Sequence, residues 1–335
     1  MNNRERRILV TGATGTVGSE VVKQLASISS SSDYNNIRAA VHTQNKVDKL
    51  EQYVDKGVEI VSLDYTKPET ISNALDKVDK LFLQTLPIPD VTDISSNFVK
   101  EAKKKGVKFI VKLSAMGADS EPTSTILRLH GMEEKIIQES GIPYIFLRPS
   151  AFMQNFVTQF GHTIKTQNTI FAPAGNSKMS FIDVRDIAAM ATMILNNNGI
   201  GQQQQSKAYD ITGPQSLSYS HVAEILSNEI GRKIRYIDLR EEDARKALKE
   251  IDMNEWIIDV MMELYSITRA GYGSQTTSVV EDLTGRKPIS FTQFAKDYVK
   301  GGTLSLMQFT IISLLILYGV FLLIMVQQKY NFLMQ

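Results

Sequence analysis

Short runs of β-branched and apolar residues alternate with helical patterns along the first half of the chain. The apolar runs predict strands at residues 7–11, 37–42, 58–63, 80–84, 108–114 and 143–148. Between them, apolar residues recur at the spacing of amphipathic helices, at residues 15–27, 46–56, 68–76, 91–105 and 124–140. The pattern therefore predicts an α/β fold in which residues 1–150 form a doubly wound parallel sheet of the Rossmann type.

The pattern becomes less regular after Pro149. It predicts strands near 169–171 and 208–212 and helices near 184–195 and 219–230. We expect residues 151–302 to form a smaller α/β domain for a substrate or a partner. Parts of 181–212 are expected to return to the main sheet, so the two domains would be interleaved.

Residues 304–326 carry no charged side chain. As one helix they would extend about 34 Å, enough to cross a hydrocarbon core of about 30 Å. Because only nine residues follow, we expect a transmembrane tail anchor; the alternative is a buried or dimerising helix. Lysines are more numerous on the domain side, so the domain is expected to face the cytosol. The endoplasmic reticulum is favoured over the outer mitochondrial membrane.

Charge and composition argue against several classes of function. The chain has 37 Lys and Arg against 36 Asp and Glu, so it lacks the net charge that attracts nucleic acid. It contains no cysteine, which excludes disulfides, thiolate catalysis and cysteine-ligated metals. The four histidines are not spaced as zinc ligands, so we expect no metal site.

A glycine-rich turn follows the first predicted strand and opens the first predicted helix. Its glycines allow the turn and let the backbone approach a pyrophosphate, and the helix N-terminus faces the phosphates. The strand–turn–helix context predicts dinucleotide binding, and the alternative is an ordinary tight turn. The residues expected to contact the cofactor are Gly12, Ala13, Thr14, Gly15, Thr16, Val17 and Gly18.

The end of the second predicted strand favours NADP(H) over NAD(H). NAD-binding folds usually carry an acidic residue there, but this chain has none before Asp48. His42 and Lys46 are expected to attract a 2′-phosphate, or alternatively to lie in a solvated loop. Asp64 ends the third predicted strand and is expected either to lie beside the adenine or to cap a turn.

Several distinctive sequence blocks follow one another along the chain. They are GxxGxxG at 12–18, KLSA at 112–115, SGIPY at 140–144, LRP at 147–149, FMQN at 152–155, FIDVRDIA at 181–188 and LTGRKP at 283–288. Together these blocks resemble the NmrA-like family of atypical short-chain dehydrogenases/reductases, which includes quinone reductases, triphenylmethane-dye reductases and NADP(H)-sensing regulators. The resemblance implies an NAD(P)-binding Rossmann domain within a fold that covers nearly all of residues 8–301.

The resemblance also assigns site residues. Typical short-chain dehydrogenases pair a tyrosine acid with a lysine four residues later. Here these positions fall on Ile126 and His130, so His130 is the candidate catalytic residue, and its alternative is a purely structural role. Glu134 is expected to orient His130 or to pair with a lysine, and Arg148 to form an ion pair or bind cofactor. The cofactor site is predicted to include Thr85, Ser114, Pro149, Phe152 and Asn155 as well.

Two functions fit these features. In the first, hydride passes directly from the cofactor to a quinone or similar conjugated small molecule, which can take its proton from water. In the second, the chain senses the NADP(H) ratio and binds a partner protein without turnover. A binding module without cofactor is a third possibility, against which the intact glycine turn argues.

Overall fold

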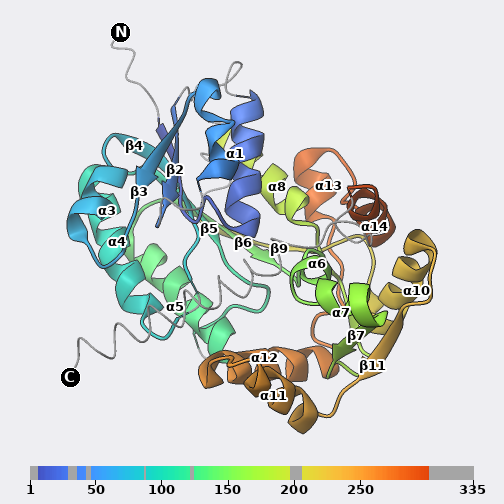
Figure 1. Cartoon of the computed structure of the whole chain (residues 1–335). Helices are drawn as coiled ribbons and strands as arrows, with labels where there is room; N and C mark the ends of the chain where they lie inside the picture. The colour runs from blue at the N-terminus through green and yellow to red at the C-terminus, as the bar shows by residue number, and fades with distance from the viewer. Residues whose placement is uncertain are drawn as a thin grey trace. The chain divides into compact units, whose positions relative to one another are not determined.

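The computed structural model describes residues 7–28, 36–42, 47–86, 88–120, 124–196 and 206–301. Contacts divide the chain into two compact units (Figure 1). The first unit comprises residues 1–150, 182–214 and 277–288, and the second comprises 151–181, 215–276 and 289–335. Each unit thus combines three segments that are far apart in the sequence.

The first unit contains a parallel sheet with strand order β3-β2-β1-β4-β5-β6-β9. Val10 of β1 pairs with Ala39 of β2 on one side and with Phe82 of β4 on the other. The chain therefore changes direction across the sheet between β1 and β4, which is the switch point where Rossmann folds bind ligands. The strands are β1 (Arg7–Val10), β2 (Asn36–Val41), β3 (Val58–Ser62), β4 (Val78–Leu83), β5 (Phe109–Leu113), β6 (Tyr144–Pro149) and β9 (Lys207–Ile211). The predicted α/β fold with a parallel Rossmann-like sheet is confirmed.

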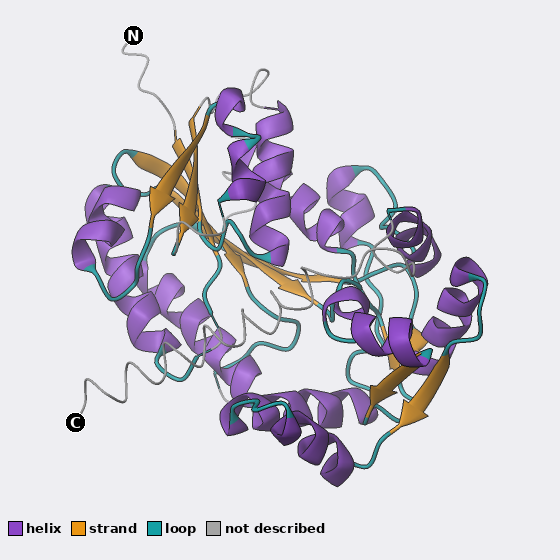
Figure 2. Ribbon diagram, in the orientation of Figure 1, coloured by secondary structure: helices purple, strands orange, loops and turns teal. Residues whose placement is uncertain are grey.

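Helices cover both faces of this sheet (Figure 2). Helix α1 packs against α8, and α4 packs against α3 and α5. The central strands are consequently buried on both faces, and every residue of β4 and β5 is buried. The helices are α1 (Thr16–Ile28), α2 (Asp48–Glu51), α3 (Pro68–Ala74), α4 (Val91–Lys105), α5 (Thr125–Ser140), α8 (Val184–Asn196) and α13 (Val279–Thr284).

The prediction of one continuous helix over residues 46–56 is wrong. The described part of this stretch contains the short α2 and a 3-10 turn, η3 (Val54–Lys56). Leu50 is fully buried, but no residue of η3 is. A longer helix would therefore have had little apolar surface to bury against the sheet.

The second unit has two small sheets. β7 (Thr169–Ala172) pairs in parallel with β11 (Arg235–Asp238), and β8 (Lys178–Met179) pairs antiparallel with β10 (Leu217–Ser218). The helices are α6 (Asn155–Thr158), α7 (Gly161–Gln167), α10 (Tyr219–Ile230), α11 (Glu241–Glu250), α12 (Glu255–Arg269) and α14 (Phe291–Lys300).

An aromatic cluster forms the core of the second unit. The fully buried ring of Phe156 lies 5.1 Å from those of Phe181 and Phe291, 5.5 Å from that of Phe160 and 5.7 Å from that of Tyr219. The contacts with Phe181 and Phe291 are edge-to-face, an arrangement that aromatic pairs favour. Phe156 and Phe160 therefore stabilise this core.

The predicted membrane anchor requires a correction. Among the described residues, none of the helices is both long enough and apolar enough to span a bilayer. The longest of them, α5, has 16 residues and extends about 24 Å, against a hydrocarbon core of about 30 Å. Residues 304–326 lie outside the described residues. Hydropathy alone does not establish a continuous spanning helix, so the predicted transmembrane helix and the predicted membrane localisation are not supported.

Candidate cofactor site

The glycine-rich turn lies at the carboxyl end of β1, beside β4. Gly12 has a φ of +61°, a conformation that side chains rarely adopt. A Cβ atom on Gly18 would lie 2.2 Å from the carbonyl oxygen of Gly12, so only glycine lets α1 pack this closely on the turn. The backbone amide of Gly15 donates to the same carbonyl at 2.9 Å. This glycine cradle, residues 12–18, lies at the N-terminus of α1, the position at which such a turn binds a pyrophosphate.

Thr11 and Gln84 join the ends of β1 and β4 beneath the turn. Thr11 Oγ1 donates to the backbone carbonyl oxygen of Gln84 at 2.9 Å and accepts from the backbone amide of Gln84 at 2.8 Å. The Gln84 side chain lies against the turn, with Cδ 3.2 Å from where a Cβ on Gly12 would be. Gln84 Oε1 is buried without a hydrogen-bond partner among the described residues. A buried orphan acceptor beside a glycine cradle fits a site that binds a ligand with hydrogen-bond donors.

The end of β2 and the end of β3 meet at His42 and Asp64. His42 is 53% exposed, and its Nε2 lies 4.0 Å from Asp64 Oδ1. Asp64 Oδ1 accepts from the amide of Thr66 at 2.9 Å and from its hydroxyl at 2.6 Å. Partial burial opposes ionisation of Asp64, but the Thr66 hydrogen bonds and the nearby His42 lower its pKa overall. Asp64 thus caps its own turn, one of its two predicted roles; Lys46 lies outside the described residues.

Glu133 and Lys112 form a buried ion pair that the sequence patterns did not single out. Lys112 Nζ lies 3.1 Å from Glu133 Oε2, and the two side chains are 0% and 2% exposed. Glu133 Oε1 accepts from Thr85 Oγ1 at 2.7 Å and from Ser95 Oγ at 2.5 Å. Burial is the largest single influence and would raise the pKa of Glu133, but Lys112, His130 and Ser95 together outweigh it and the pKa falls to about 2. The available signal was a lysine inside an apolar strand, because a buried charge requires a partner.

His130 lies one turn before Glu133 on α5. Its Nδ1 is 3.5 Å from Glu133 Oε2, and the side chain is 20% exposed. Burial lowers the pKa of His130, and the proximity of Glu133 only partly offsets this effect. The imidazole is therefore neutral at physiological pH.

The helix is held firmly at this point. A Cβ on Gly131 would lie 2.0 Å from the backbone carbon of Asp119, so the loop after β5 packs directly onto α5.

Glu134 binds a different set of groups. Its Oε1 accepts from Ser114 Oγ at 2.5 Å and from Arg148 Nε at 2.9 Å, and its Oε2 pairs with Arg148 Nη2. Arg148 is therefore a member of an internal ion pair, one of its two predicted roles. Glu134 pairs with an arginine rather than with a lysine, and the carboxylate that faces His130 is Glu133.

The structure brings some of the predicted site residues together. Thr85, Glu133 and His130 form one cluster, and Ser114 joins the Glu134 cluster. Pro149 ends β6 in the first unit, whereas the half-buried Phe152 and Asn155 belong to the second unit. The assignment of all these residues to the cofactor stays a prediction.

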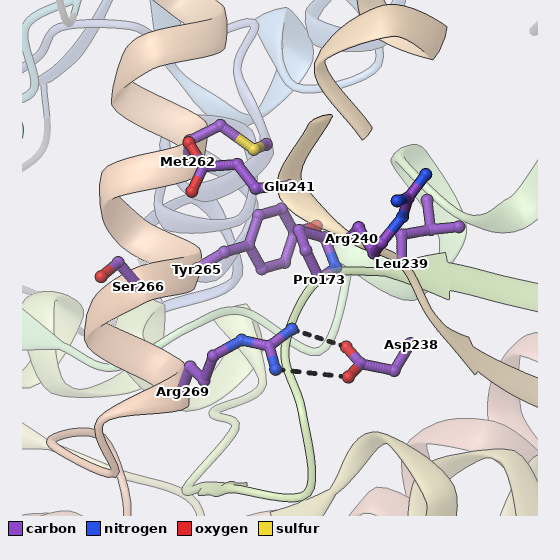
Figure 3. A pocket seen from close by; sticks show the side chains of 9 residues that line it. All are labelled: Pro173, Asp238, Leu239, Arg240, Glu241, Met262, Tyr265, Ser266 and Arg269. Carbon is purple, nitrogen blue, oxygen red and sulfur yellow. Dashed lines mark hydrogen bonds and ion pairs between the residues drawn. The ribbon is translucent and has the colours of Figure 1, made fainter. Parts of the chain in front are cut away.

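The second unit contains a pocket of about 300 Å³. Tyr265, Asp238 and Arg269 are among the residues that line it, and Arg269 Nη2 lies 2.8 Å from Asp238 Oδ1 (Figure 3). A second lining residue, Arg240, binds Asp243, also at 2.8 Å. Both arginines already bind a carboxylate, so this pocket lacks the free positive charge of a phosphate site.

The chain matches the NmrA-like family over residues 4–292. It is 35% identical over 289 residues to an NAD(P)H azoreductase of Xenophilus azovorans, covering 86% of this chain and 96% of that protein. It is 26% identical over 257 residues to quinone oxidoreductase 2 of Escherichia coli, covering 76% of this chain and 86% of that protein. The triphenylmethane reductase of Citrobacter sp. complexed with NADP(H) has a similar structure, with a TM-score of 0.74 at 26% identity, covering 87% and 99%.

Proposed function

We propose that this chain, which belongs to the NmrA-like family, is an NAD(P)H-dependent reductase of small conjugated acceptors such as quinones or azo compounds. The glycine cradle of residues 12–18 at the switch point of the sheet carries this proposal. The azoreductase and the quinone oxidoreductase among its relatives support an NAD(P)H-dependent oxidoreductase.

The cradle and its neighbours would hold the cofactor. The backbone amides of the turn and the N-terminus of α1 bind negatively charged phosphates. Gln84 Oε1 is an unused acceptor that could bind a hydroxyl or amide group of the cofactor, since the phosphates themselves only accept hydrogen bonds. When bound, a dihydronicotinamide supplies the hydride. The protein's part is to fix the acceptor next to that ring and to exclude water from it.

No tyrosine acid is expected to take part. Ile126, at the position of that tyrosine, is 9% exposed and packs in the core. An aliphatic side chain cannot donate a proton, so the chain is suited to acceptors that spread the arriving charge. Quinones and azo compounds do so through conjugation, and they can take the proton from water.

NADP(H) is the favoured cofactor. β2 ends at Val41 without an acidic residue, and the exposed His42 follows it directly. β2 itself thus brings no carboxylate that would repel a 2′-phosphate, and the carboxylate of Asp64 on the neighbouring strand end is already bonded to Thr66. NADP(H)-bound relatives such as the triphenylmethane reductase support the same preference.

The test measures NADPH binding and NADPH oxidation by the purified full-length chain with a panel of quinones and azo dyes. Binding and turnover above the enzyme-free rate are expected. Gly15→Asp should abolish both, because a carboxylate would enter the phosphate cradle. Gly301→Asp adds the same charge at the exposed end of α14 and serves as the control. Tight binding without turnover of any acceptor would instead favour the redox sensor, and absence of binding would refute the cofactor assignment.

A further inference from the structure

The pocket of the second unit holds a tyrosine whose hydroxyl group has no protein partner. Tyr265, on α12, lines this cavity of about 300 Å³, and its ring extends from the helix towards Pro173 (Figure 3). Among the described residues, none forms a hydrogen bond with the Tyr265 hydroxyl, and burial raises its pKa. Small-molecule sites have volumes of about 300–1,000 Å³, so the cavity is large enough for a small ligand. A polar group without a protein partner in such a cavity is available to that ligand.

Tyr236, in the same apolar core, shows that a tyrosine here can be fully bonded. Its hydroxyl lies 3.0 Å from the carbonyl oxygen of Ala172 and 3.1 Å from Asp238 Oδ1. It also accepts from the backbone amide of Ala174 at 3.2 Å. Both tyrosines pack against the core of the second unit, but only Tyr236 has its hydroxyl satisfied within the described residues. The unpaired hydroxyl of Tyr265 is therefore a property of the pocket.

Asp238, the last residue of β11, fixes the segments that form the pocket. Its Oδ1 accepts from the backbone amide of Gly175 at 2.9 Å and from Arg269 Nη2 at 2.8 Å. Ser177 Oγ donates to the backbone carbonyl oxygen of Arg269 at 2.7 Å. The loop after β7 is thus bonded to both β11 and α12. A ligand that enters the pocket has little ordering of the protein to offset, which favours binding.

The charged side chains that line the pocket are all engaged in ion pairs. The pairs are Arg269 with Asp238, Arg240 with Asp243 and Arg245 with Glu241, at 2.8–2.9 Å. The lining itself contributes two arginines and two carboxylates, so its charges cancel. A charged ligand would have to break one of these pairs or remain unpaired beside them. The pocket therefore favours an uncharged ligand.

The uncharged lining residues favour an aromatic ligand. Met262, which is buried, lines the pocket together with Pro173 and Leu239. Methionine sulfur and tyrosine rings both make favourable contacts with an aromatic ring. Guanidinium groups also stack on aromatic faces while their edges stay bonded to carboxylates. Ser266, on the same helix as Tyr265, adds a second hydroxyl group to this apolar surface.

We propose that this pocket is a binding site for an uncharged aromatic small molecule that carries a hydroxyl or carbonyl group, and that the Tyr265 hydroxyl forms a hydrogen bond with that group. The ring of the ligand lies against Met262 and Pro173. The inference goes beyond the proposed reductase activity and does not depend on it. Of the described residues that line the pocket, none belongs to the predicted cofactor site, and all belong to the second unit.

Calorimetric titration of the full-length chain with 2-naphthol, in the absence of NADPH, tests for such a site. 2-Naphthol is an uncharged aromatic hydroxyl compound at neutral pH, and we expect it to bind. Naphthalene-2-sulfonate has the same rings with a negative charge and should bind about tenfold more weakly or worse, because the arginines are already paired. Absence of 2-naphthol binding, or equal or tighter binding of the sulfonate, would overturn the proposal.

Ser266→Trp tests where the ligand binds. Ser266 is exposed on α12, so an indole at this position can fill the pocket without entering the core. The variant should lose 2-naphthol binding and keep the thermal stability of the wild type. Ala247→Trp, at an exposed position of α11 that does not line the pocket, is the control and should bind 2-naphthol normally. Undiminished binding in Ser266→Trp would show that the ligand lies elsewhere.

Tyr265→Phe tests the hydrogen bond. The variant should bind 2-naphthol about fivefold more weakly, which corresponds to the loss of one hydrogen bond between uncharged groups. 2-Methylnaphthalene lacks the hydroxyl group and should bind the wild type and the variant equally. An equal loss of affinity for both compounds would show that Tyr265 only packs against the ligand, and would refute its role in recognition. Because neither titration contains NADPH, failure here leaves the reductase proposal untouched.

Discussion

Lys112 Nζ and Glu133 Oε2 are 3.1 Å apart, and neither side chain is more than 2% exposed. One residue lies on β5 and the other on α5, so the pair connects the sheet to the helix that carries His130. Surface ion pairs contribute little to stability, but a buried charge that loses its partner is strongly destabilising.

Glu133→Ala is therefore expected to lower the free energy of unfolding by about 3–5 kcal/mol, because it leaves the ammonium of Lys112 buried and unpaired. Urea denaturation measures the loss. Glu20→Ala removes the partner of Lys23, which is 54% exposed, and should cost less than about 1 kcal/mol. Equal losses in the two variants would contradict the buried pair.

The same pair predicts how stability depends on pH. The folded pKa of Glu133 is about 2, below its ordinary value of 4.5. The unfolded state binds the proton more readily than the folded state. The contribution of the ionised Glu133 to the free energy of unfolding is therefore complete above pH 4.5 and is lost as the pH falls towards 2. Urea denaturation across this acid range should show a smaller loss for Lys112→Met/Glu133→Leu than for the wild type. If the free energy of unfolding falls equally with pH in both proteins, the pKa of Glu133 is not lowered by folding.

Two glycine substitutions should differ in severity. A Cβ on Gly18 would meet the Gly12 carbonyl oxygen at 2.2 Å, whereas one on Gly15 would lie 3.1 Å from the same atom. Gly18→Ala is expected to cost about 1–3 kcal/mol by overpacking and to weaken NADPH binding. Gly15→Ala should be milder in both respects. Thermal unfolding measures the stability of both variants, and NADPH titration measures their affinity for the cofactor. A larger loss in Gly15→Ala than in Gly18→Ala would refute this description of the turn.

His42→Asp should change the cofactor preference. A carboxylate at the end of β2 would repel a 2′-phosphate and could bind the ribose hydroxyls of NAD(H). We expect NADPH affinity to fall about tenfold or more and NADH affinity to change less. His162→Asp, at an exposed position in the second unit, is the control. An unchanged ratio of NADPH affinity to NADH affinity would show that His42 does not contact the cofactor.

Gln84→Ala tests the residue that covers the turn. Its side chain lies against Gly12 and Gly15, and its Oε1 is a buried acceptor with no described partner. The variant should bind NADPH about fivefold more weakly with little change in stability. Gln138→Ala, on the exposed face of α5, should match the wild type. Loss of stability without loss of affinity would make Gln84 a packing residue only.

The sequence patterns predicted the periodic parts of the fold well. The strands of the sheet lie within a few residues of their predicted positions, and α10 has the predicted bounds 219–230. The parallel pairing of β7 with β11 was not foreseen, since Tyr236 and its neighbours are only partly buried and show no strong alternation. Short, half-exposed strands carry little pattern of their own.

The polar cluster shows a different limit. Sequence spacing allowed either Glu133 or Glu134 to reach His130, because residues three and four apart both lie on one helix face. The choice depends on Lys112 and Arg148, which approach from neighbouring strands. Local spacing does not predict which strand residue pairs with which helix residue. The sequence therefore did not indicate Glu133, although Lys112 lies in the KLSA block at 112–115.

The interleaved first unit has a consequence for how the chain folds. β9 pairs with β6 although some sixty residues, including part of the second unit, separate them, and Arg286 binds the buried Asp186 of α8 at 2.9 Å. During synthesis, β6 is therefore an unpaired sheet edge until β9 has been made, and Asp186 lacks the ion pair with Arg286 until residue 286 has been made. Unpaired edges promote aggregation, and non-local pairing slows folding. A fragment that stops at residue 150 is thus expected to aggregate rather than to fold as an independent domain.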